Sequence, residues 1–458
     1  MKIIILGAGQ VGRTVAYNLA REESNDVTVV DIEREPLREL QDRLDVRTVQ
    51  GHASHPNILE NAGGNDADIV IALTNSDETN IVACQVCYTL FHTPTKIARV
   101  RSAEYVKRNK LFMQEAMPVD VIISPETLVT EYIERLIHHP GALQVLEFAE
   151  GRVRLVGVRA HADGLLVGQA LKTLKEHIPN TESRVAAIYR DGQSIAPKGD
   201  TLIKEDDEVF FLAARKDIRV VMSELRKLEA PVRRVVIAGG GNIGFSLALA
   251  LERTNAVRII ERNRARARAI SEKLAKAIVL VGDAADEELL LEENIDTADV
   301  FCAVTNAEEA NILSAMLARR LGARKVMALI NRPSYADLVE SGTIDIAISP
   351  QQVTLSSLLA HVRRGDVSKV YALRRGAAEA IETVAHGTKD NSRVVGRRID
   401  EIALPPSTQI SALVRGDEVI IAHHDTVVEA DDHVIVFVND RKQVPAVEKL
   451  FEVKVSFV

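Results

Sequence analysis

The sequence predicts an α/β protein made of two tandem units, each a parallel-sheet domain followed by a small α+β subdomain. A glycine-rich loop closes a short apolar strand twice in the 458-residue chain, at 2–12 and 234–244. Short Val/Ile/Leu runs then alternate with helical segments, which is typical of parallel strands covered on both faces. Other stretches recur in the same order in both halves, which indicates a duplication. Residues 51–53 match 282–284, 72–80 match 303–311, and 119–125 match 344–350.

The elements of the first parallel sheet follow from local composition. Each predicted strand is a short aliphatic run, and the runs lie at 3–6, 27–30, 69–73, 97–100 and 121–123. Helices fill the gaps between them, for example at 11–21 and 78–91. Strand and helix therefore alternate throughout this part of the chain.

The remainder of each unit changes character. Residues 184–213 and 409–438 hold paired strand signals around turn residues such as Asp191-Gly192 and Gly416-Asp417. This pattern predicts β-hairpins, in modules of about 80 to 90 residues. Pro231 marks the junction of the halves. The predicted domains are 1–124, 141–225, 232–348 and 368–453.

A helix with a wide apolar stripe links the two parts of each unit. The stripe consists of Leu128, Val129, Tyr132, Ile133, Leu136 and Ile137 in the first half, and of Val353, Leu355, Leu358, Leu359 and Val362 in the second. Such a stripe either packs on its own domain or docks on a partner unit, and the sequence leaves both interpretations open.

Composition argues against several classes of protein. The net charge of −8 disfavours a general nucleic-acid binder, which carries a basic face. Three cysteines are too few to staple a chain of this length, which fits a reducing cytoplasm. No run approaches the roughly 18 to 20 apolar residues of a membrane span, so we expect any contact with a membrane to go through a partner.

The first glycine loop predicts a phosphate-binding site. Glycines at a strand–helix turn let backbone N–H groups point at a phosphate, beside the positive end of a helix dipole. The loop comprises Gly7, Ala8, Gly9, Gln10, Val11 and Gly12. Asp31 ends the next predicted strand, where a carboxylate accepts the ribose hydroxyls of adenosine and repels a 2′-phosphate. The combination favours NAD over NADP.

Further candidates follow neighbouring strands of the same sheet. Thr74 and Asn75 come directly after 69–73, and Arg99 and Arg101 lie at the end of the next strand. Open α/β sheets bind ligands at the carboxyl ends of their strands, and a guanidinium there suits a diphosphate. The alternative interpretation is a surface arginine, or one in a subunit contact.

The second glycine loop predicts a second nucleotide site, whose ligand can differ from the first. Its candidate residues are Gly239, Gly241, Asn242, Ile243, Gly244 and Glu261. An arginine, Arg262, follows the acidic residue directly, so the second site excludes a 2′-phosphate less clearly than the first. Asp283 could reach an adenine. The arginine pair of the first half is replaced by Leu329 and Asn331, with Arg332 alongside.

Neither half offers an evident group for chemistry on a substrate. A dehydrogenase needs an acid or base opposite the nicotinamide, and we find no compact group of that kind outside the sheet units. The Cys84-x-x-Cys87 spacing lies inside a predicted helix without a second pair, so a buried pair of cysteines is a better interpretation than zinc or redox chemistry. We expect no enzyme and no metal site. The alternatives are an NAD-dependent oxidoreductase built as a fused pair and a redox sensor acting on transcription.

These residues closely resemble the RCK family (regulator of potassium conductance, also called KTN). The resemblance rests on 2–12, 76–80, 184–188 and 239–244. It covers essentially the whole chain as two tandem RCK units, each a Rossmann-like parallel-sheet domain followed by a small α+β C-terminal subdomain. It departs at His52, where many members have an aspartate.

The resemblance implies a role. RCK units assemble into rings, and chains with two units form tetramers that dock on the cytoplasmic face of a TrkH- or TrkG-like potassium-translocating membrane protein. NAD(H) and ATP or ADP change the shape of the ring and so gate potassium flux. By resemblance, residues 7–11, Asp31, Thr74, Asn75 and Arg99 contact NAD, and 239–261 belongs to a second nucleotide site. We therefore expect a regulatory subunit that is peripheral on the inner membrane through its partner.

Overall fold

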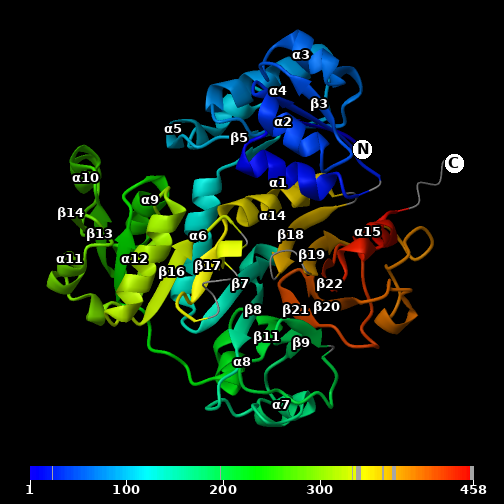
Figure 1. The fold of residues 1–458 in the computed structure, drawn as a ribbon. Helices are drawn as coiled ribbons and strands as arrows, with labels where there is room; N and C mark the ends of the chain where they lie inside the picture. Colours follow the sequence, from blue (N-terminus) through cyan, green and yellow to red (C-terminus); the bar gives the residue numbers. More distant parts are fainter. Residues whose placement is uncertain are drawn as a thin grey trace. The chain divides into compact units, whose positions relative to one another are not determined.

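The computed structural model describes residues 1–22, 24–195, 197–332, 334–336, 342–363, 366–373 and 378–453. Contacts divide the chain into two compact units, Met1–Val129 with Pro350–Val362, and Thr130–Ser349 with Arg363–Val458 (Figure 1). The division cuts across the duplication, because a short piece of the second repeat belongs to the first unit. Among the described residues, no helix is both long enough and apolar enough to cross a membrane.

The first unit contains the first predicted parallel sheet. Its strand order is β3-β2-β1-β4-β5-β6, and every pairing is parallel. The strands are β1 (Lys2–Leu6), β2 (Asp26–Asp31), β3 (Arg47–Gln50), β4 (Ile69–Ala72), β5 (Thr95–Arg99) and β6 (Val121–Ile123). The sequence predicts five of them. It does not predict β3, because this edge strand is mostly polar.

Helices connect these strands. They are α1 (Gln10–Leu19), α2 (Arg34–Gln41), α3 (Pro56–Asn61), α4 (Asp77–Phe91) and α5 (Ala103–Val106). Helix α4 begins after Ser76, whose hydroxyl accepts a hydrogen bond from Thr79 N, and it ends at His92 in a left-handed conformation. Cys84 and Cys87 are fully buried on α4, and burial raises the pKa of the Cys87 thiol to about 12. The predicted buried pair is confirmed.

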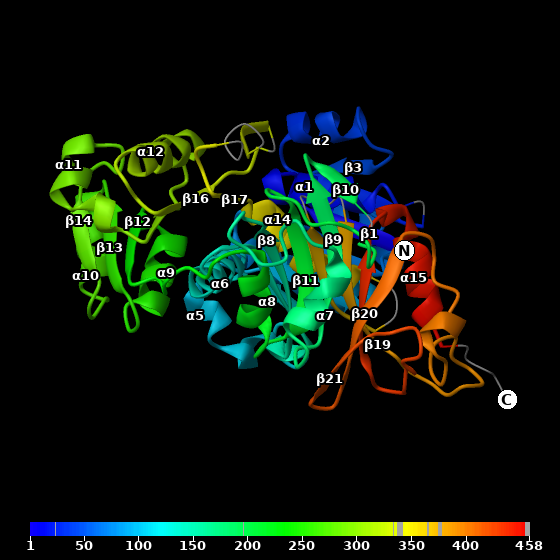
Figure 2. The same cartoon turned by 90° about the horizontal axis from the view of Figure 1, so that it is seen from below.

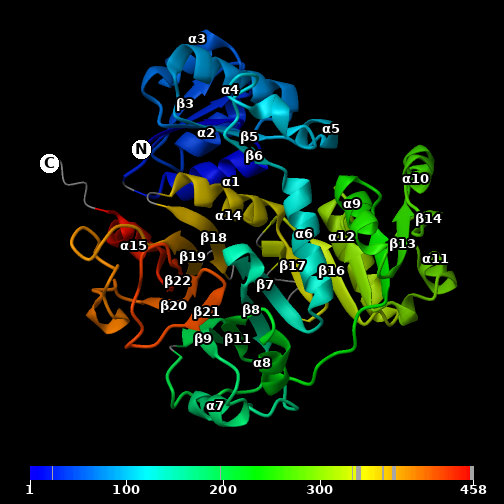
Figure 3. The same cartoon turned by 180° about the vertical axis from the view of Figure 1, so that it is seen from behind.

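Helix α14 (Pro350–Val362) comes from the second repeat but packs in the first unit, against α1 and β6 (Figure 3). Its buried stripe residues are Leu355, Leu358, Leu359 and Val362. For this helix the docking interpretation is therefore confirmed. The corresponding helix of the first repeat is α6 (Pro125–His138), whose buried residues include Val129, Ile133, Leu136 and Ile137.

The second unit contains the second parallel sheet, with the matching order β14-β13-β12-β15-β16-β17. The strands are β12 (Arg234–Ala238), β13 (Ala256–Glu261), β14 (Ile278–Val281), β15 (Val300–Ala303), β16 (Lys325–Leu329) and β17 (Ile346–Ile348). The helices are α9 (Asn242–Leu251), α10 (Arg264–Ser271), α11 (Glu287–Glu292) and α12 (Glu308–Arg320). The duplicated architecture is the one the sequence predicts.

Two antiparallel sheets complete the second unit. The first antiparallel sheet has the order β10-β9-β11-β8-β7, from β7 (Ala142–Phe148), β8 (Val153–Arg159), β9 (Ser183–Arg190), β10 (Gln193–Ile195) and β11 (Glu208–Ala214). The second has the order β18-β19-β22-β20-β21, from β18 (Val367–Leu373), β19 (Ala378–Val384), β20 (Thr408–Arg415), β21 (Glu418–Ile421) and β22 (His433–Val438). The predicted hairpins are confirmed as β9–β10 and β20–β21.

Short helices border these sheets. They are α7 (Leu174–His177), α8 (Ile218–Leu225) and α15 (Val444–Phe451). Single 3-10 turns lie at η1 (Gly64–Asp66), η2 (Asn109–Phe112), η3 (Ala149–Gly151), η4 (Leu171–Thr173), η5 (Ile295–Thr297), η7 (Ile399–Glu401) and η8 (Arg441–Gln443).

The two antiparallel sheets lie side by side (Figure 2), and they share one hydrophobic core. Core residues from the first sheet include Phe148, Leu155, Phe210 and Leu212, and those from the second include Leu373, Ile435 and Phe437. Hydrogen bonds cross the same boundary, because the carbonyl oxygen of Glu147 accepts from Lys369 Nζ and from the Tyr371 hydroxyl, each at 3.0 Å. The repeats are thus joined by a common apolar interior as well as by the chain.

The same ion pair, a buried aspartate with a partly exposed arginine, is present in both antiparallel sheets. Asp207 is fully buried and lies 2.7 Å from Arg190 Nε. Asp432 is fully buried and lies 2.8 Å from Arg415 Nη2. Each arginine also donates to a main-chain carbonyl group, so the pair is well hydrogen-bonded. A buried carboxylate left without its partner is strongly destabilising, which explains why both repeats keep the two residues together.

We expect Phe148→Ala to weaken the junction of the two antiparallel sheets. Phe148 is fully buried and meets Tyr371 of the other sheet edge-on, with ring centroids 5.2 Å apart. Removing a buried phenyl ring costs about 3–5 kcal/mol. Urea unfolding followed by circular dichroism measures the loss. The control is Leu202→Ala at a half-exposed position, for which a change of about 0.5 kcal/mol or less is expected. Equal transitions for the two variants would contradict the shared core.

Candidate functional site

The first glycine loop has a geometry that only glycine allows at two positions. Gly7 has φ +105°, and its N–H donates to Val30 O at 2.7 Å. A Cβ at Gly12 would lie 1.9 Å from the carbonyl oxygen of Gly7. Strand β1 and helix α1 therefore approach each other too closely for any side chain between them.

Gly9 has a different role from its neighbours. A Cβ at Gly9 would meet no heavy atom within 4 Å, so this glycine faces open space. Helix α1 begins at the next residue, and no side chain caps its first turn, which contains no acidic residue. The N–H groups of that turn and the positive end of the helix dipole are thus available to an anion. The residues present fit the diphosphate of a nucleotide.

Asp31 lies beside this loop, at the end of β2. Its carboxylate accepts from Ala8 N at 2.5 Å and from Glu33 N at 2.9 Å. An ionised carboxylate has about four acceptor positions, so capacity remains for ribose hydroxyls. Asp31 therefore holds the glycine loop in shape and offers the acceptor that the sequence analysis predicts.

The carboxyl ends of β1, β4 and β5 are neighbours along one edge of the sheet. Asn80 is fully buried at this edge and joins two of the strands. Its Oδ1 accepts from Thr74 N at 2.9 Å and from Thr74 Oγ1 at 2.7 Å, and its Nδ2 donates to Arg99 O at 2.9 Å. The sequence analysis did not assign Asn80 to the site. The available signal is its recurrence as Asn311, which makes the same bonds to Thr305 and to Leu329 O.

Arg99 and Arg101 have separate roles. Arg99 Nη2 lies 3.9 Å from Glu126 Oε1 in the first turn of α6, and Arg99 Nε is buried without a hydrogen-bond partner in the described structure. Burial lowers the pKa of Arg99, and Glu126 opposes that shift. Arg101 donates to Asn75 O and lies 3.5 Å from Asp77 Oδ1. Arg99 thus keeps donor capacity for an anion, whereas Arg101 braces the loop after β4.

The second glycine loop repeats the backbone geometry. Gly239 has φ +107°, and a Cβ at Gly244 would lie 1.9 Å from Gly239 O. Glu261 takes the place of Asp31 and accepts from Gly240 N and Asn263 N, each at 2.7 Å. The loop again opens a helix at Asn242 and Ile243, with Gly241 facing open space.

The side chains around the second loop differ from those of the first. Arg266 donates from Nε to Gly240 O at 2.8 Å, and Arg262 lies 3.6 Å from Asp283. Leu329, buried, stands where the first repeat has Arg99. Arg332 pairs with Glu308 at 3.5 Å. The second loop therefore has Arg262 and Arg266 near it, whereas Arg332, the cation that follows β16, is paired with Glu308.

His52 follows β3, next to Asp31, because Gln50 pairs with Asp31 and Gly51 N donates to Asp31 O. His52 is exposed, stacks on His55 with ring centroids 4.7 Å apart, and contacts Ser54 Oγ. In the described residues, no group of three or more His, Cys, Asp or Glu side chains could hold a metal ion.

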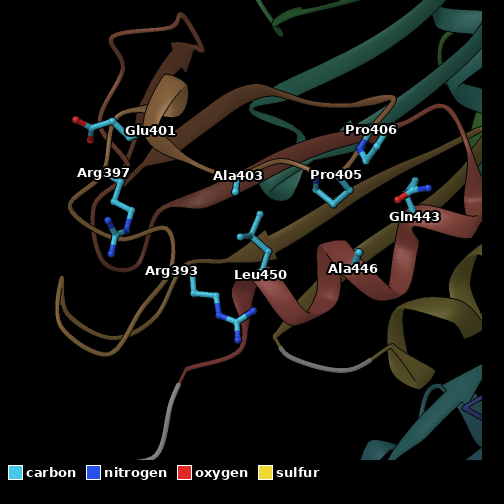
Figure 4. Close-up of a pocket in the computed structure, with 9 residues that line it drawn as sticks. All are labelled: Arg393, Arg397, Glu401, Ala403, Pro405, Pro406, Gln443, Ala446 and Leu450. Carbon is cyan, nitrogen blue, oxygen red and sulfur yellow. The ribbon is translucent and has the colours of Figure 1, made fainter.

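A separate hollow of about 520 Å³ lies in the second antiparallel module (Figure 4). It is lined by Arg393, Arg397, Glu401, Ala403, Pro405, Pro406, Gln443, Ala446 and Leu450. Ala446 and Leu450 belong to α15, and none of the predicted nucleotide-site residues takes part. Of its two arginines, Arg393 is exposed and Arg397 is half-buried.

Known protein families and known proteins match this chain from end to end. The TrkA-N domain family matches 3–125 and 235–350, and the TrkA-C domain family matches 155–226 and 388–452. The chain is 60% identical to the Trk system potassium uptake protein TrkA of Halomonas elongata over 457 residues, covering 100% of both chains. It is 60% identical to the protein of the same name from Vibrio alginolyticus, covering 99% of each, and 51% identical to that of Haemophilus influenzae.

Solved structures share the fold at low identity. The GsuK RCK domain aligns with a TM-score of 0.61 and 17% identity, covering 98% of this chain and 94% of that one. A GsuK channel bound to NAD aligns with a TM-score of 0.61 and 18% identity, covering 98% and 79%. The tandem RCK architecture is therefore shown by both sequence and fold.

We expect the two glycines of the first loop to separate binding from folding. Gly9→Val should leave thermal unfolding unchanged but abolish NADH binding at the first loop, because the side chain enters the open space beside α1. Gly12→Ala should lower the unfolding temperature, because its Cβ overlaps Gly7 O. Differential scanning fluorimetry and fluorescence titration with NADH check the pair. Gly241→Val is the matched control at the second loop. Normal NADH binding by the Gly9→Val, Gly241→Val double variant would refute the loop assignment.

Proposed function

This chain belongs to the TrkA family of potassium uptake proteins, and from that premise we propose that it is a nucleotide-sensing regulatory subunit that gates a potassium-translocating membrane protein. The observation that carries the proposal is the first glycine loop. An open position at Gly9 and an uncapped helix start lie together in this loop, and the Asp31 carboxylate at the end of β2 is hydrogen-bonded to it. A regulator needs a ligand with different affinities for two shapes and needs no reacting group, so a site of this kind is sufficient.

NAD(H) is the effector that suits the first loop best. The N–H groups of residues 10–12 would hold the diphosphate, and Asp31 would accept the ribose hydroxyls while disfavouring a 2′-phosphate. Thr74, Asn75 and Arg99 would line the same edge of the sheet. A solved structure of similar fold is described as the GsuK channel bound to NAD, which supports this ligand class.

ATP or ADP is proposed as a further effector. The second loop has the same backbone, with Gly239, Gly241 and Gly244 at the turn and Glu261 beside it. The nearby Arg262 and Arg266 would favour a ligand with more negative charge. The two loops therefore need not hold the same nucleotide.

The path from ligand to partner is proposed to start at Arg99. Its contact with Glu126 is long, at 3.9 Å, and Glu126 lies in the first turn of α6, which leads to the first antiparallel module. A phosphate near Arg99 competes with Glu126 for the guanidinium. Nucleotide binding would thereby change the restraint on α6.

The proposed assembly is a tetramer on the cytoplasmic face of the inner membrane, held there by a TrkH- or TrkG-like protein. The relatives in Halomonas, Vibrio and Haemophilus carry the name of a potassium uptake system, which supports a transporter as partner. Nothing in the proposal requires nucleic acid or direct insertion into the bilayer.

The proposed function is tested in two steps, by capture of the membrane partner and then by measurement of potassium flux through it. We expect tagged protein to recover a potassium-translocating membrane protein from detergent-solubilised membranes, identified by mass spectrometry. In proteoliposomes of that partner, potassium flux should depend on this chain and respond to NADH and to ATP. Flux that ignores both nucleotides would rule out the gating role. Hydride turnover on a small substrate would point to an oxidoreductase instead.

We expect Asp31→Ala to raise the dissociation constant for NADH at the first loop by about tenfold or more, because hydrogen bonds to a charged acceptor contribute about 1.5–3 kcal/mol. Isothermal titration calorimetry measures the change. Asp31→Asn is the shape-preserving control, since it keeps an acceptor for Ala8 N. Unchanged affinity for NADH in both variants would show that Asp31 does not contribute to nucleotide binding.

A further inference from the structure

The first glycine loop is touched by a side chain from the other repeat. Gln351, the second residue of α14, accepts a hydrogen bond from Thr14 Oγ1 at 3.0 Å. Its Nε2 donates to Gln10 Oε1 at 3.3 Å. Gln10 is the first residue of α1 and directly follows Gly9, and Thr14 lies one turn later on the same helix. All three residues belong to the first unit.

Packing holds Gln351 at this place. Helix α14 lies against α1 and β6, and Leu355, Leu358 and Leu359 are buried. Thr354 Oγ1 donates to Pro350 O at 2.7 Å, which fixes the first turn of α14. The amide therefore reaches the start of α1 from a rigid element, and holding it there costs little additional side-chain entropy.

The equivalent position in the first repeat carries a different charge. The motif Ser124-Pro125-Glu126 in the first repeat corresponds to Ser349-Pro350-Gln351 in the second. Glu126 faces Arg99, a cation, whereas Gln351 faces the uncapped start of α1. A carboxylate at 351 would oppose an anion bound there, and a neutral amide does not.

The chain also joins Gln351 to the second sheet over a very short distance in sequence. Strand β17 ends at Ile348, which pairs with Leu329, and Ser349 alone separates this strand from α14. A single residue therefore links the first turn of α14 to the carboxyl end of β17 in the second parallel sheet.

We propose that Gln351 is a positioning residue of the first nucleotide site and that it makes occupancy of this site depend on the docking of α14. The proposal rests on the proposed function, because it assumes a nucleotide at the first loop. Gln351 orients Gln10 and Thr14 at the mouth of the loop and keeps negative charge away from the diphosphate. By linkage, whatever strengthens the docking of α14 strengthens nucleotide binding, and the reverse holds equally.

The test uses the full chain with the second loop closed by Gly241→Val. Dissociation constants are measured by calorimetry for ATP, NADH and adenosine with Gln351→Ala and Gln351→Glu. We expect Gln351→Ala to weaken ATP and NADH binding by about threefold, the loss of one modest hydrogen bond. Gln351→Glu should weaken NADH binding by about tenfold and ATP binding by more, and it should leave adenosine binding unchanged. High salt should remove these effects.

This dependence on ligand charge distinguishes a positioning role from a purely structural defect. A structural defect would weaken the binding of all three ligands equally, and that result would overturn the proposal. Ser357→Ala, at a half-buried position of the same helix, is the matched control and should bind normally. Hydrogen exchange provides a second readout. NADH should slow exchange of residues 350–362 in the parent chain and not in Gln351→Ala.

The failure of this inference is distinguishable from failure of the proposed function. If Asp31→Ala weakens NADH binding but both Gln351 variants bind all ligands normally, the first loop holds the nucleotide and Gln351 has no role in it. If Asp31→Ala also binds normally, the nucleotide is not at the first loop, and both the site assignment and this inference are wrong.

Discussion

The sharing of one hydrophobic core by the two antiparallel sheets is the constraint on which the rest of the structure depends. Apolar residues of both sheets meet in that core, so each module buries there a surface that it would expose alone. Helix α14 belongs to the first unit, whereas the chain on either side of it belongs to the second. Arg363, buried directly after α14, pairs with buried Glu379 at 3.1 Å and ties the chain back to the second antiparallel sheet.

The two repeats keep the same backbone geometry at the glycine loop but differ in the charges of the surrounding side chains. Both loops place a glycine Cβ position 1.9 Å from a carbonyl oxygen, because the approach of strand and helix tolerates no alternative. Around that fixed turn the charges differ. Arg99 corresponds to the apolar Leu329 and Glu126 to the neutral Gln351, whereas Asp31 corresponds to Glu261 and keeps its charge. Sterics constrain the turn absolutely, whereas a peripheral charge alters only which anion binds and how tightly.

The candidate site shows which parts of a binding site local sequence can reveal. The glycine positions and Asp31 follow from a motif with a physical reason for each residue, and in the structure Asp31 accepts a hydrogen bond from the glycine loop. Asn80 escapes this reasoning, because a buried amide joining two strands has no local pattern of its own. Its importance is visible only when its partners, Thr74 and the carbonyl of Arg99, are placed next to each other by the sheet.

The sequence by itself determined the fold class, the duplication, both glycine turns, most of the strands and the hairpins, because these depend on periodicity and on backbone conformations reached within a few residues. Tertiary structure alone decided which surface the apolar stripe of α14 covers, and hence that Gln351 meets Gln10. A stripe records that one face is buried but not against what, since apolar burial is non-directional. Contacts between residues 341 positions apart are chosen by the packing of the whole chain.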